Sequence, residues 1–103
     1  MKLLTTLAIV GGLMTVLAAQ AAPDAERAQA ALKKSDCFKC HAVDKKKDGP
    51  PFKETAKKYK GKADAEDKLI KHITTKPMVE VDGKKEEHRS VRSTDPDAIR
   101  NLV

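Results

Sequence analysis

Aromatic side chains are scarce in this chain. Its 103 residues include no Trp, one Tyr and two Phe. A domain of this size buries little surface, and small domains usually depend on a disulfide, a metal or another bound group for stability. The chain lacks the large side chains from which a core of its own could be built. We therefore expect a bulky apolar ligand to complete the core.

Long apolar runs are absent beyond the start of the chain. One such run, residues 3–17, follows Lys2 and leads into small residues that end at Ala22. This is the pattern of an export signal with its cleavage site, and the run is shorter than the roughly 20 residues of a membrane-spanning helix. We predict that 1–21 is a cleaved secretory signal peptide. Residues 22–103 are then one domain without stable membrane insertion.

Cysteine is limited to Cys37 and Cys40. Export would place them in the periplasm, an oxidising compartment where disulfides persist, but so short a loop would constrain the unfolded chain only weakly. A zinc site would need four ligands, and the spacing of the histidines resembles no zinc finger. A thioredoxin-like pair should follow a buried strand, whereas the segment before Cys37 is typical of a helix that ends in lysines.

Apolar periodicity predicts four short helices and no strand. The helices are expected over residues 24–34, 52–59, 63–74 and from Asp95-Pro96 to the end, where Asp can cap a helix that Pro begins. Residues 45–51 and 76–92 are predicted loops, the second because it has neither helical nor strand periodicity. The expected fold class is all-α, with long loops that need a central group to pack against.

Cys37-Phe38-Lys39-Cys40-His41 is a C-x-x-C-H motif, the haem attachment motif of c-type haem proteins. Two thiols at this spacing can reach the two vinyl groups on one edge of a porphyrin and bond to them as thioethers. The next residue, His41, is then placed to bind the iron as the proximal ligand. The motif predicts one covalently attached haem c.

From Ala31 to its end, the chain resembles the small soluble class I cytochromes c of bacteria. The resemblance is carried by Cys37–His41, Asp44, Gly49-Pro50 eight residues beyond the histidine, Lys57–Gly61, Ala63–Thr74 and Ala98–Val103. It implies a class I cytochrome c fold, about four short helices and long loops wrapped around one haem. It also implies that the carbonyl of Pro50 accepts a hydrogen bond from His41, which would fix the imidazole tautomer. The last helix is shorter here than is usual in that family, which bears on its packing against the first helix.

The sixth iron ligand is usually a methionine in that family. Met78 lies only five residues after Ile73, nearer the third helix than the family's methionine. His88 lies fifteen residues after Ile73 and fourteen before Leu102, which resembles the family's position better. We favour His88 as the distal ligand and keep Met78 as the alternative, while His72 is expected on an exposed helix face. A methionine ligand raises the reduction potential of a haem, and a second imidazole should lower it.

Lysine is abundant, and the formal net charge is +6. Many lysines flank the haem motif or the loop after it: Lys33, Lys34, Lys39, Lys45, Lys46, Lys47, Lys53, Lys57, Lys58, Lys60 and Lys62. They form either a solvated surface or a docking face for an acidic redox partner, which would steer association. Nucleic acid is not an expected partner, because the chain is aromatic-poor and carries no recognition motif.

These patterns predict a periplasmic one-electron carrier, a monomer and not an enzyme, that exchanges electrons with redox-partner proteins. One alternative is a haem sensor or catalytic haem domain with a labile sixth ligand, which the long loop at 76–92 would permit. The other alternative is a haem-free interaction module.

Overall fold

The structure is a computed structural model and describes residues 22–103; the predicted signal peptide, residues 1–21, lies outside the described residues. The elements are α1 (Ala25–Lys34), the 3₁₀ turn η1 (Cys37–Lys39), α2 (Phe52–Tyr59), α3 (Ala65–Thr74), β1 (Met78–Val81), β2 (Lys84–Glu87) and α4 (Pro96–Arg100). The four predicted helices are all present. The first starts one residue and the third two residues later than predicted, and the last ends at Arg100 instead of continuing to the end of the chain. No helix of the described part is long and apolar enough to cross a membrane.

Two helices begin where the sequence offers a cap. The Asp24 carboxylate accepts the backbone N–H of Arg27 at 3.0 Å, which satisfies one of the free donors at the start of α1. The Asp95 carboxylate likewise accepts the N–H of Asp97 at 3.0 Å, and Pro96 is the first residue of α4. These local signals explain why both helix starts are readable from the sequence.

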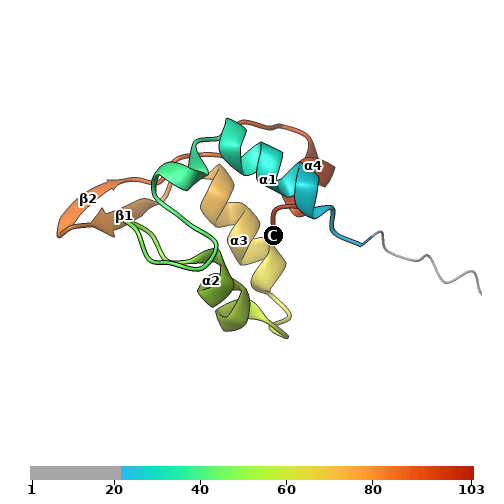
Figure 1. Cartoon of the computed structure of the whole chain (residues 1–103), viewed down its shortest axis with the longest axis horizontal. Helices are drawn as coiled ribbons and strands as arrows, with labels where there is room; N and C mark the ends of the chain where they lie inside the picture. Colours follow the sequence, from blue (N-terminus) through green and yellow to red (C-terminus); the bar gives the residue numbers. More distant parts are fainter. Residues whose placement is uncertain (1–21) are drawn as a thin grey trace, which may run out of the picture.

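α4 packs against both α1 and α3 (Figure 1). The backbone N–H of Asp24 donates to Asn101 Oδ1 at 2.7 Å, and Asn101 Nδ2 donates to the Asp24 carbonyl at 2.8 Å. Arg100 Nε donates to Glu66 Oε1 at 3.0 Å, which links α4 to α3. Short as it is, the last helix therefore packs against the first through a reciprocal pair of hydrogen bonds.

Residues 76–92 are not the irregular loop that the sequence analysis predicts. β1 and β2 pair antiparallel, with Met78 opposite Glu87, and form a hairpin at one side of the molecule (Figure 1). Asp82 and Gly83 connect the strands with φ of 51° and 76°, the backbone of the two-residue turn that best matches strand twist. The prediction of no strand was wrong because β2 is exposed throughout and carries no apolar residue. The Asp-Gly pair was the available signal.

Apolar side chains are only partly shielded by the rest of the protein. Apart from Pro51, no apolar residue among 22–103 is fully buried, and Ser35, 3% exposed, is the buried polar residue. Met78 is 60% exposed and Val43 is 41% exposed. This half-open packing agrees with the scarcity of aromatic side chains, which predicts that a bulky ligand completes the core.

Candidate haem-binding site

The C-x-x-C-H motif occupies a tight turn directly after α1. The Cys37 carbonyl accepts the backbone N–H groups of Cys40 at 3.2 Å and His41 at 3.0 Å. Asp36, just before the turn, has φ of 61°, a left-handed conformation that Asp tolerates better than most residues. The two cysteines are half-buried and not bonded to each other. One turn thus presents two sulfurs and an imidazole.

The surroundings of Cys37 do not suit a redox-active thiol pair. Burial, followed by the charge of the Asp36 carboxylate, raises the pKa of the Cys37 thiol, although a backbone hydrogen bond acts in the other direction. Cysteines that exchange disulfides instead have lowered pKa values. Over residues 22–103, no three His, Cys, Asp or Glu side chains are grouped to hold a metal ion. The thiol-exchange alternative therefore loses support.

Three neighbours fix the imidazole of His41. Its Nδ1 lies 2.8 Å from the Pro50 carbonyl, the contact that the family resemblance implies. The Phe52 ring stacks on it, with centroids 5.0 Å apart and planes 18° apart. Gly49 is so close that a Cβ at that position would lie 2.7 Å from Nδ1. A carbonyl only accepts hydrogen bonds, so Nδ1 carries the proton and Nε2 keeps the lone pair that can bind iron.

The structure brings His88 close to His41 and leaves Met78 on the surface. The ring centroids of His41 and His88 are 6.2 Å apart, with 60° between the planes. Met78 begins β1 with an exposed side chain. His72 is exposed, as expected, but its ring centroid lies only 4.3 Å from that of His88. That neighbour was not predicted, because it depends on how the hairpin folds back toward α3.

The surroundings of His88 favour the neutral form of its imidazole. Its backbone N–H donates to the Pro77 carbonyl at 2.8 Å, which closes the base of the hairpin. Burial, together with the nearby His72 and His41, lowers the pKa of its imidazole, and the neutral ring is the form that binds metals. Its Nδ1 is buried without a hydrogen-bond partner. Buried polar atoms almost always have partners, so this nitrogen is one that a bound group could satisfy. Two imidazoles that can bind iron and two thiols that can bond to a porphyrin edge suit a haem.

The cytochrome c family model matches residues 25–103. This chain belongs to the cytochrome c family. Cytochromes c carry a covalent haem c at a C-x-x-C-H motif, here Cys37, Cys40 and His41. The predictions of one covalent haem and of membership among the small class I c-type cytochromes are confirmed.

Individual relatives agree with the family assignment. Cytochrome c-551 of Pseudomonas aeruginosa is 41% identical over 49 residues, 48% of this chain and 47% of the relative. Cytochrome c-551 of Allochromatium vinosum is 37% identical over 60 residues, 58% of this chain and 64% of the relative. The matches thus span less than two thirds of either relative.

A solved structure extends the likeness to the fold. The class 1 cytochrome MtoD from Sideroxydans lithotrophicus ES-1 matches with a TM-score of 0.75 and 48% identity, covering 79% of this chain and 90% of that one. The predicted class I cytochrome c fold is confirmed, with the β-hairpin as an addition to the predicted helices. The chain is a member of a family of electron-carrying haem proteins.

Three charged side chains lie together beside the motif: Asp36, Arg89 and Arg92. The sequence analysis gives none of them a role. Asp36 Oδ2 lies 2.8 Å from Arg92 Nη2 and 3.4 Å from Arg89 Nη1. No local pattern could reveal this contact, because the partners are more than fifty positions apart in the sequence.

The lysines of the predicted docking cluster are all exposed. One of them also has a structural contact, because Lys47 Nζ donates to the Phe38 carbonyl at 2.6 Å, across the loop that follows the motif. Asp64, outside the cluster, pairs with Lys68 at 2.8 Å on the exposed surface of α3. The exposure of the cluster permits docking but does not identify a partner.

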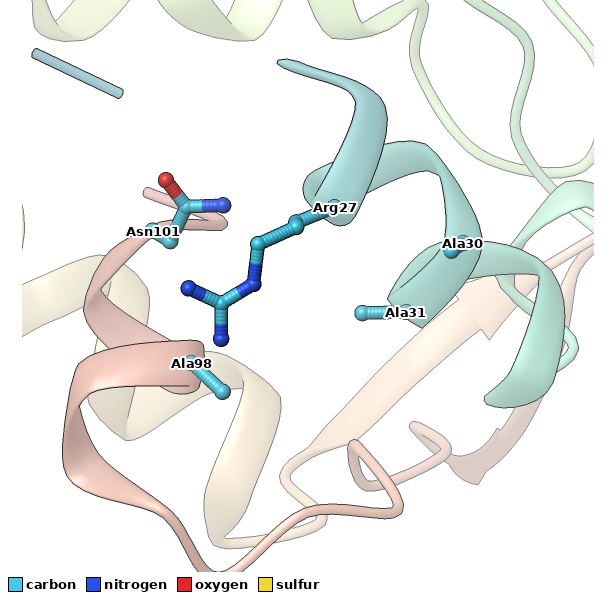
Figure 2. Close-up of a pocket in the computed structure, with 5 residues that line it drawn as sticks. All are labelled: Arg27, Ala30, Ala31, Ala98 and Asn101. Atoms are coloured by element: carbon cyan, nitrogen blue, oxygen red, sulfur yellow. The ribbon is translucent and has the colours of Figure 1, made fainter. Parts of the chain in front are cut away.

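An open hollow of about 220 Å³ lies between α1 and α4. It is lined by Arg27, Ala30, Ala31, Ala98 and Asn101 (Figure 2). Figure 2 shows the Arg27 side chain extending from α1 toward α4. None of the residues of the candidate haem site lines this hollow, so we assign it no part in haem binding.

Proposed function

We propose that this chain is a periplasmic electron carrier in which Cys37 and Cys40 hold one haem and His41 and His88 are the axial ligands of its iron. The one-electron redox chemistry is supplied by the haem when bound. The chain attaches that group, sets its axial ligands, shields it and presents a charged surface to partners. Family membership supports the electron-carrying role, and the ligand assignment depends on the geometry of the two imidazoles.

The distance between the two imidazoles is the observation that carries this assignment. If metal–nitrogen bonds are about 2 Å long and each ring centroid lies about 1 Å behind its nitrogen, two axial imidazoles have centroids about 6 Å apart. The centroids of His41 and His88 are 6.2 Å apart. The Met78 side chain, by contrast, is 60% exposed.

The choice of distal ligand has a functional consequence. A methionine ligand raises the potential of a haem iron, whereas a second imidazole donates more strongly to the ferric ion. A carrier ligated by His41 and His88 therefore belongs to a lower-potential pathway than one ligated by methionine. With both axial positions filled by protein, small molecules compete poorly for the iron, which favours electron transfer over sensing or catalysis.

The hairpin also favours the carrier over a protein with a labile sixth ligand. That alternative depended on a long irregular loop at 76–92. The segment instead forms paired strands whose base is closed by the hydrogen bond from His88 to Pro77. A ligand held at the end of a hairpin loses less conformational entropy on binding than one on a free loop.

The periplasmic location and the docking face are supported by the sequence. The apolar run and small residues of 1–21 have the form of an export signal, and haem is attached to such motifs outside the cytoplasm. The exposed lysines near the motif suit an acidic redox partner, with association that weakens as salt rises.

The test is a set of three single variants of the haem-loaded mature protein: His88→Ala, Met78→Ala and His72→Ala. We expect the wild-type protein to show one reversible one-electron couple. His88→Ala should open the sixth position and let reduced protein bind carbon monoxide rapidly, whereas Met78→Ala and His72→Ala should behave like the wild type. Rapid, full binding of carbon monoxide by the wild type would overturn the carrier assignment. A change of ligation in Met78→Ala but not in His88→Ala would overturn the ligand assignment.

A further inference from the structure

We propose that Asp36 is a positioning residue for the distal ligand. Together with Arg89 and Arg92, it forms a clasp that ties the segment carrying His88 to the turn carrying Cys37. This inference rests on the proposed function, since it takes His88 as the distal ligand. The following contacts support it.

Arg92 makes three separate contacts with the segment before the haem motif. Its Nη2 lies 2.8 Å from Asp36 Oδ2, and its Nη1 donates to the Lys34 carbonyl at 3.0 Å. Its backbone N–H donates to the Ser35 hydroxyl at 3.0 Å. Ser35 is only 3% exposed, so this part of the contact is shielded from water. Residues 34–36 therefore hold both the backbone and the side chain of Arg92.

Two further cations converge on the same carboxylate. Arg89 Nη1 lies 3.4 Å from Asp36 Oδ2, and Lys39 Nζ lies 3.8 Å from Asp36 Oδ1. The Asp36 side chain is 24% exposed, whereas the Arg92 side chain is 59% exposed. An isolated exposed ion pair contributes little, but a half-buried carboxylate shared by several donors forms a network of charge-assisted hydrogen bonds. The carboxylate is the centre of this network.

The clasp joins the two segments that carry the haem-attaching Cys37 and the proposed distal ligand His88. Asp36 directly precedes the haem-attaching Cys37, and Arg89 directly follows His88. The segment between His88 and Arg92 is held at two other points, by the hydrogen bond from His88 to Pro77 and by that from Val91 to the Ile73 carbonyl at 2.9 Å. Those bonds reach the hairpin and α3. Arg92 also reaches Lys34 and Ser35, but the Asp36 carboxylate is the contact next to Cys37 and the one that Arg89 shares. Its loss should allow His88 to leave the iron more often.

Asp36→Asn is the sharpest change because it keeps the backbone. Asp36 has φ of 61°, and Asn tolerates this left-handed conformation as Asp does. The variant therefore removes the negative charge without new backbone strain. Arg92→Ala tests the same contact from the other side, away from the attachment motif, should Asp36→Asn impair haem attachment.

An arginine–carboxylate pair that joins α4 to α3 serves as the control. Arg100 Nε lies 3.0 Å from Glu66 Oε1, and the Arg100 side chain is 59% exposed, the same as that of Arg92. Glu66→Gln thus removes a carboxylate, itself 55% exposed, from an arginine whose side chain is as exposed as that of Arg92, and this pair joins α4 to α3 rather than to the His88 segment. This variant shows how much the loss of an ion pair elsewhere in the protein changes the rate of carbon monoxide binding.

The experiment measures carbon monoxide binding to the reduced, haem-loaded protein at saturating gas, where release of the distal ligand limits the rate. We expect Asp36→Asn and Arg92→Ala to bind about tenfold faster than the wild type, the change that about 1.4 kcal/mol in the activation free energy for release of His88 produces. The Arg92→Lys variant should bind carbon monoxide at a rate between those of the wild type and Arg92→Ala, because lysine keeps the charge but cannot contact two acceptors as the guanidinium does. Glu66→Gln should bind at the wild-type rate.

The His88→Ala variant, measured in the same experiment, distinguishes failure of the ligand assignment from failure of the clasp. If His88→Ala does not accelerate binding, the ligand assignment and the clasp are both wrong. If it does, and Asp36→Asn and Arg92→Ala keep the wild-type rate, only the clasp is overturned. An equal acceleration in Glu66→Gln would also overturn it, since the effect would then be general loosening.

Discussion

The two sides of the haem site are built differently. On the proximal side, the proposed ligand His41 is held by neighbours within eleven positions: Gly49, Pro50 and Phe52. On the distal side, His88 depends on a hairpin and on contacts with Ile73, Ser35 and Asp36 made by the residues that follow it. Local contacts leave a motif in the sequence, whereas distant ones do not. The proximal side should therefore tolerate little change, and the distal side should be adjustable.

The largest effect is expected on the proximal side, from removing both attachment sulfurs. Cys37→Ser with Cys40→Ser cannot form thioethers, so we expect all haem staining to disappear from a denaturing gel. Lys39→Ala, between the two cysteines, is the control and should stain like the wild type. Staining of the double variant would show that haem is attached elsewhere.

Replacing the proposed distal ligand should change the reduction potential without loss of haem. His88→Met exchanges an imidazole for a thioether, and we expect the reduction potential to rise by about 0.1 V, within the roughly 0.8 V range that axial ligands cover. A potentiometric titration measures it. Met78→Ala should leave the potential unchanged. If Met78→Ala changes the reduction potential and His88→Met does not, Met78 and not His88 is the distal ligand.

A single methyl group should disturb the proximal side. In Gly49→Ala the new Cβ would overlap the His41 ring, which cannot move away while Nδ1 is bonded to Pro50. We expect a loss of about 1–3 kcal/mol in the free energy of unfolding, measured by denaturant titration, together with a changed absorption spectrum. Gly61→Ala is the control: nothing lies within 4 Å of its Cβ position, so its strain is confined to the backbone and the spectrum should not change. An unchanged spectrum in both variants would remove Gly49 from the site.

The smallest effect is expected at the tip of the hairpin. Gly83 has φ of 76° with open space around it, so Gly83→Ala should cost about 1–2 kcal/mol of local strain. Because the tip is distant from the base that His88 closes, the reduction potential should stay at the wild-type value while the melting temperature falls by a few degrees. A shift of the potential would mean that the distal side is coupled to the whole hairpin.

The contrast between local and distant contacts also explains what could be predicted from the sequence. The helices, the covalent haem and the Pro50 contact follow from caps, from C-x-x-C-H and from a family pattern, all of which are local. The hairpin was missed because Lys84–Glu87 has no apolar alternation, although Asp82-Gly83 marks its turn. The clasp at Asp36 and the approach of His72 to His88 could not be predicted at all. They depend on how distant segments meet in three dimensions.

The central claim is that iron is held between His41 and His88, and the absorption spectrum of the oxidised protein tests it most directly. Methionine ligation of ferric haem gives a weak far-red charge-transfer band, which ligation by two imidazoles does not give. We expect the band to be absent from the wild type and from Met78→Ala. A far-red band in the wild type that disappears in Met78→Ala would contradict the account.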